Sequence, residues 1–131
     1  MKILSAAILA TILGMFSGTP SHAIERCGDS NIGIWKANSE RGRPGQRAFG
    51  SYCLGKFAQH NADSQDNTAE GAKRALVMYR LSNRHFFRVS AMLPRLGATD
   101  RLRMQDVTKL TEHNDVRIVE IRRNRVHWQS N

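Results

Sequence analysis

The sequence contains few cysteines, few aromatic residues and few acids, and it lacks the common motifs of enzymes. Two of its 131 residues are Cys, 7% are aromatic, and 11 Asp and Glu face 20 Lys and Arg. There is no CxxC, HExxH, GxSxG, Walker or GxGxxG pattern. The chain therefore lacks the best-known sequence signatures of redox proteins, zinc enzymes, hydrolases and nucleotide-binding proteins. We therefore predict no catalytic residue, no metal ligand and no cofactor.

The start of the chain has the pattern of a secretory signal peptide. Lys2 is followed by 14 uncharged residues at 3–16, and the segment 17–23 ends in Ser21-His22-Ala23. Basic, apolar and small residues in this order are typical of a cleaved signal. The alternative is an uncleaved membrane anchor, although the run is shorter than the roughly 20 residues that span a bilayer. We predict cleavage after residue 23, a single domain over 24–131, and a periplasmic or secreted location. No transmembrane segment is expected after signal removal.

The two cysteines, Cys27 and Cys53, both follow the predicted signal. An exported protein enters an oxidising compartment, so a disulfide between them is expected. A metal pair and a redox pair are the alternatives, but the spacing of the two residues matches neither type of site. A disulfide would also disfavour Cys53 as a nucleophile.

Positive charge is concentrated in the second half of the chain. Residues 24–72 contain six basic and six acidic residues, whereas residues 73–131 contain 13 basic and five acidic residues. Eleven of those 13 are Arg, whose planar guanidinium binds phosphate and carboxylate in a bidentate manner. The asymmetry predicts an acidic partner. The alternative is a solvated surface with scattered ion pairs.

Two helices are predicted in the first part of the domain. Residues 46–60 place Phe49, Cys53 and Phe57 at four-residue spacing, which favours a helix despite two glycines; a strand is the alternative. Residues 68–81 form the clearest helix, with Thr68 as its N-cap. Residues 31–35 are expected to form a short strand.

The last third of the chain is predicted to be rich in β-strand. Residues 86–94 alternate, with Phe87 and Val89 on one face, and residues 116–121 are β-branched. Turns are expected at 112–115 and 122–125, the second leading into a final strand at 126–128; residues 100–110 fit a strand or a short helix. Helices followed by contiguous strands predict an α+β fold, with two helices packed on an antiparallel sheet of three to four strands.

The candidate binding surface consists of six arginines in two groups. One group steps by four residues from the second helix into the next strand, and the other lines the hairpin turn; the six are Arg80, Arg84, Arg88, Arg122, Arg123 and Arg125. If helix and hairpin pack side by side, the groups form one patch that would bind phosphates with a steep salt dependence. The alternative is that arginines on edge strands block aggregation.

These features favour a non-enzymatic binding or accessory protein of the bacterial periplasm or cell surface. Its partner would be an acidic protein or an anionic envelope component, within an envelope, secretion or conjugation system; nucleic acid is less favoured. One alternative is a small exported nuclease or toxin, in which His85 or His127 acts with Glu120 and either Arg80 or Arg122. Another is an inhibitor or immunity protein of an exported enzyme.

Overall fold

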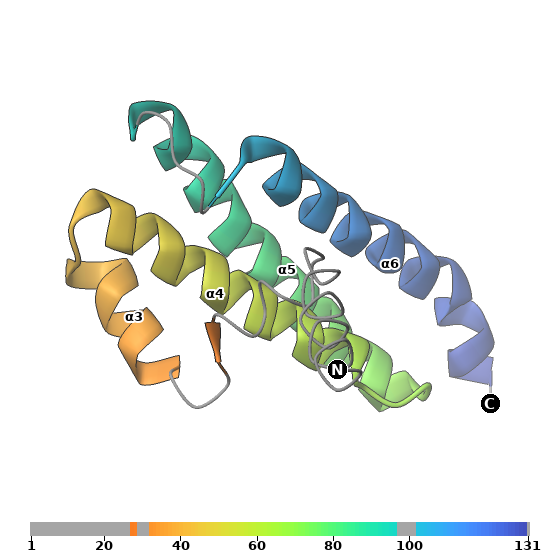
Figure 1. The fold of residues 1–131 in the computed structure, drawn as a ribbon. Helices are drawn as coiled ribbons and strands as arrows, with labels where there is room; N and C mark the ends of the chain where they lie inside the picture. Colours follow the sequence, from red (N-terminus) through yellow and green to blue (C-terminus); the bar gives the residue numbers. More distant parts are fainter. Residues whose placement is uncertain (1–26, 29–31, 97–101, 131) are drawn as a thin grey trace, which may run out of the picture. The chain divides into compact units, whose positions relative to one another are not determined.

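A computed structural model describes residues 27–28, 32–96 and 102–130, with the side chains of 125–130 excepted. These residues form α-helices and one 3-10 turn, and no strand occurs among them (Figure 1). The elements are α3 (Ile32–Arg41), α4 (Pro44–Asp63), α5 (Ala69–Met92), η2 (Leu93–Arg95) and α6 (Met104–Ser130). The predicted α+β fold is therefore wrong: the described part is all-α.

Helix α5 begins as predicted but continues well beyond residue 81. Thr68 has extended backbone angles and its hydroxyl accepts a hydrogen bond from the Gly71 amide at 3.0 Å, which confirms the N-cap. The predicted strand at 86–94 is wrong. Phe86 and Val89, three residues apart, are both fully buried, whereas Phe87 is 77% exposed. Helical spacing, and not alternation, thus determines which side chains enter the core, and Pro94 lies in the following 3-10 turn.

Helix α6 replaces the predicted turns, strands and hairpin of the C-terminal third. Its buried side chains Val107, Asn114 and Ile121 are seven residues apart, which is the period of one helix face. Val116 and Val119 belong to the β-branched run that predicted a strand, and they are 57% and 50% exposed. The helix contains no Gly or Pro to stop it. Residues 100–110 follow the helical alternative from Met104 onward.

Of the two predictions that fall in α3 and α4, one is confirmed and one is wrong. The helix expected at 46–60 is confirmed inside α4, but the described part of the strand expected at 31–35 is the first turn of α3. The two glycines that weakened the prediction allow close packing. A Cβ on Gly55 would lie 2.6 Å from the Phe86 ring, and one on Gly50 would lie 2.6 Å from the Trp35 carbonyl oxygen. Glycine therefore lets α4 approach both α5 and α3.

Helix α5 packs against α4 on one side and α6 on another, while α3 packs on α4 (Figure 1). A buried polar network joins the three long helices. Asn114 of α6 donates to Ser82 Oγ at 2.9 Å and accepts from Gln59 Nε2 at 2.9 Å. Ser82 Oγ in turn donates to the Gly55 carbonyl at 2.7 Å. Each of these groups is satisfied, so burial carries no penalty for an unpaired polar atom.

Cys27 and Cys53 are both disulfide-bonded, as predicted. Across the residues described, no helix is long and apolar enough to cross a bilayer. The predicted signal sequence at 1–23 lies outside the described residues.

Candidate anion-binding surface

The exposed side of α5 carries three of the six arginines that were predicted to bind an acidic partner. Lys73, Val77, Arg80, Arg84, Phe87 and Arg88 are all exposed. With 3.6 residues per turn, they lie within an arc of about 100° and extend along roughly 22 Å of the helix. We call these six residues the outer face of α5. Only three of them, Arg80, Arg84 and Arg88, were predicted from the sequence.

Arg80 and Arg84 are the cations of this face that have no partner in the described part of the chain. No hydrogen bond or ion pair joins either guanidinium to another of the described side chains. Lys73 differs because it pairs with Glu70 at 3.6 Å, although both side chains are more than 70% exposed. An ion pair so exposed is weak and leaves Lys73 able to exchange partners.

Arg88 has a structural partner. Its guanidinium donates to the Ser39 carbonyl oxygen at 2.8 Å and to Ser39 Oγ at 3.3 Å. Ser39 lies in the last turn of α3, where carbonyls lack partners within the helix. Arg88 therefore provides a hydrogen-bond donor for a carbonyl in the last turn of α3 and places its positive charge at the negative end of the helix dipole. Of the three α5 arginines predicted for binding, this one is committed to packing.

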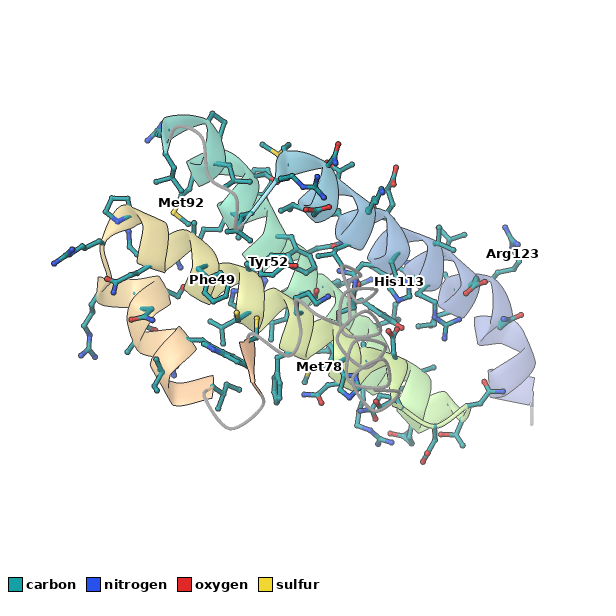
Figure 2. All side chains as sticks on the ribbon, viewed as in Figure 1. Phe49, Tyr52, Met78, Met92, His113 and Arg123 are labelled. Atoms are coloured by element: carbon teal, nitrogen blue, oxygen red, sulfur yellow. The ribbon has the colours of Figure 1, made fainter. Side chains whose placement is uncertain are left out.

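The α6 arginines do not form a hairpin turn. Arg122 and Arg123 are exposed and consecutive on a helix, so their side chains leave it about 100° apart. Figure 2 shows Arg123 extending outward from the C-terminal part of α6. Arg125 belongs to the same helix, but its side chain lies outside the described residues.

The register of α5 and α6 separates the two arginine groups along the helices. Asn83 donates to Asp115 at 3.0 Å, and Ile121 packs in a cluster with Ala72 and Tyr79. The residues that follow Ile121 are thus level with the N-terminal half of α5. Arg122 and Arg123 lie toward the Lys73 end of the outer face of α5, away from Arg84 and Arg88.

The residues proposed for a nuclease are not joined in the described structure. His85 is half-buried, and burial lowers its pKa, with further lowering by the charges of Arg88 and Arg84. Glu120 instead pairs with Arg117 at 2.6 Å. Among the described side chains no hydrogen bond links His85 to Glu120, and the His127 side chain is outside the description.

A polar cluster that was not predicted from the sequence connects α4, α5 and α6. The hydroxyl of Tyr79 donates to Asp63 and accepts from Arg117 Nε at 3.2 Å, while His113 Nε2 lies 2.9 Å from the same carboxylate oxygen. Burial, followed by the hydrogen bond to Asp63, raises the pKa of Tyr79 to about 12. Asp63 and His113 are 50 residues apart, so only the folded chain brings them together. Figure 2 shows His113 on α6, facing the other helices.

The described residues also include a buried lysine, Lys56. Lys56 of α4 is 5% exposed; desolvation lowers its pKa, and the charge of Asp106 partly opposes that effect. Within the described part of the chain, no three His, Cys, Asp or Glu side chains are arranged to hold a metal ion.

No protein-family profile matches this chain, and neither the curated proteins nor the solved structures include one with significant similarity to it.

Proposed function

We propose that this chain is an exported accessory protein that binds an acidic partner through the outer face of α5. The observation that carries the proposal is the pair Arg80 and Arg84, one helical turn apart, exposed and without an acidic partner among the described residues. Guanidinium groups in this state can form bidentate bonds to carboxylates or phosphates without first breaking an internal ion pair.

The charge distribution supports this assignment. Residues 73–131 carry all the net positive charge of the segment that follows the predicted signal, and such asymmetry increases the rate of encounter with acidic partners. Arg122 and Arg123 add exposed positive charge on α6, level with the N-terminal half of α5. We place the protein in the bacterial periplasm or at the cell surface, within an envelope, secretion or conjugation system.

Salt-dependent retention on immobilised heparin tests the binding. The variant R80Q/R84Q removes both free cations and keeps side chains of similar length. R41Q/R95Q is the matched control, because Arg41 and Arg95 are exposed on other elements and make no side-chain bond in the described structure.

We expect R80Q/R84Q to elute at distinctly lower salt than the wild type and R41Q/R95Q to elute close to it. Equal shifts for the two variants would show that net charge, and not the α5 face, determines retention. A third variant, R122Q/R123Q, measures the contribution of α6 and is expected to give an intermediate shift.

A further inference from the structure

We propose that the acidic partner is the phosphate surface of an anionic lipid bilayer, and this inference rests on the proposed function. The outer face of α5 contains apolar as well as cationic side chains. Val77 is 59% exposed and Phe87 is 77% exposed. They lie before and after Arg80 and Arg84 along the helix, about 15 Å apart along the axis and about 80° apart around it.

Apolar tips flanking cations suit the boundary between lipid headgroups and acyl chains. Helices that lie in this interface insert aromatic and aliphatic side chains, while Lys and Arg bind the anionic headgroups. Arginine also extends its apolar stem along the inserted surface and keeps its charged end at the phosphates. Apart from Glu70, which pairs with Lys73, no acid lies on α5 to repel an anionic surface.

The size of the face argues against a folded protein as the partner. A strip roughly 22 Å long and about 10 Å wide covers only about 220 Å². A stable protein interface needs about 800 Å² on each side, with a well-packed apolar centre. Here the centre is two flexible arginines, and the apolar side chains lie at the two ends. A fluid lipid surface adapts to that pattern, whereas a rigid acidic protein must match it.

Vesicle flotation with the purified, oxidised protein tests the proposal. The vesicles contain either phosphatidylcholine alone or phosphatidylcholine with phosphatidylglycerol. We expect binding only when phosphatidylglycerol is present. A cation near an anionic surface strengthens binding about fivefold, so R80Q/R84Q should bind roughly 25-fold more weakly. The control R41Q/R95Q should bind as the wild type does.

The apolar contribution needs its own variant. Removing a buried Phe side chain from an apolar environment weakens binding by about tenfold or more, so F87S should bind phosphatidylglycerol vesicles at least that much more weakly. Its retention on heparin, which offers charge but no acyl chains, should be unchanged. Since Phe87 is mostly exposed, the fold should remain intact, and circular dichroism checks this.

The outcomes separate this inference from the proposed function. Heparin retention that depends on Arg80 and Arg84, without binding to anionic vesicles, overturns the lipid proposal and leaves an acidic protein or polysaccharide as the partner. Equal binding of F87S and wild type to the vesicles also overturns it. Failure to bind either heparin or vesicles overturns both proposals.

Discussion

Arg88 on α5 donates a 2.8 Å hydrogen bond to the carbonyl oxygen of Ser39 on α3. The bond distinguishes this arginine from Arg80 and Arg84, which belong to the same face but have no such partner among the residues that the structure describes. Three arginines at four-residue spacing look equivalent in the sequence, yet one is bonded to α3 and the other two are those that we propose for binding.

This difference predicts that two similar variants change stability by different amounts. R88Q should lower the free energy of unfolding by about 1 kcal/mol, since it removes a charged hydrogen bond to a helix end. R80Q should leave stability within about 0.5 kcal/mol of the wild type. Urea denaturation measures both. A loss of stability in R80Q as large as in R88Q would contradict the assignment.

The buried network around Asn114 predicts a large loss of stability. N114A should lower the free energy of unfolding by about 2–3 kcal/mol, because Gln59 and Ser82 each lose a buried partner. The control N124A changes an exposed Asn of the same helix, where we expect little effect. If both variants unfold at the same urea concentration as wild type, the network does not stabilise the bundle.

The close packing of α4 and α5 predicts contrasting effects for two glycine variants. G55A should destabilise the protein by about 1–3 kcal/mol, since the added methyl group overlaps the Phe86 ring. G45A lies in the first turn of the same helix with nothing within 4 Å of the new Cβ, so it should be neutral or slightly stabilising. Thermal unfolding monitored by circular dichroism compares the two, and a stable G55A would place Phe86 elsewhere.

Tyr79 predicts a specific pH dependence at the alkaline end. Its pKa is about 12 in the folded chain against the ordinary value of 10, so the folded state keeps the phenol proton where the unfolded state releases it. The resulting stability is fully present below pH 10 and is lost as the pH rises from 10 to 12. Y79F should remove this contribution to the slope of the unfolding free energy against pH, as measured by denaturation at several pH values. An unchanged slope in Y79F would show that other groups cause the loss of stability.

Part of the fold could be predicted from the sequence because the signals for it lie between residues close in the chain. The Thr68 hydroxyl caps α5 through the amide of a residue three positions later, and the apolar residues of 46–60 recur with the helical spacing seen in α4. The disulfide was predicted from the signal-like start of the chain and from the presence of two cysteines in the sequence.

The C-terminal third was mispredicted because β-branched residues are ambiguous. Val116 and Val119 favour strands, but in α6 they are exposed and contribute little packing, while Val107, Asn114 and Ile121 anchor the helix. Tertiary packing of that seven-residue stripe outweighs local propensity. The seven-residue spacing was present in the sequence, and it was the signal that favoured a helix.

The candidate site was only partly predictable, since its residues depend on helix extent. A strand at 86–94 cannot place Phe87 beside Arg80 and Arg84, but a continuous α5 does. The contact between Arg88 and Ser39 joins residues 49 apart, so no local pattern indicates it. The same is true of Asp63 and His113.

The predicted signal peptide has a direct chemical test. Expression of the full chain in a bacterium, followed by mass spectrometry of the exported protein, should show a mature N-terminus at Ile24. Retention of Lys2 in the exported protein would instead favour the uncleaved anchor.

We propose that Arg80 and Arg84 form the anion-binding part of the molecule. The salt concentration at which R80Q/R84Q and R41Q/R95Q elute from heparin, compared with the wild type, tests this proposal. The two variants lose the same charge from exposed positions, so only the place of the charge differs. We predict a large decrease for R80Q/R84Q and little change for R41Q/R95Q. Identical elution of the two variants would show that Arg80 and Arg84 are not the anion-binding site.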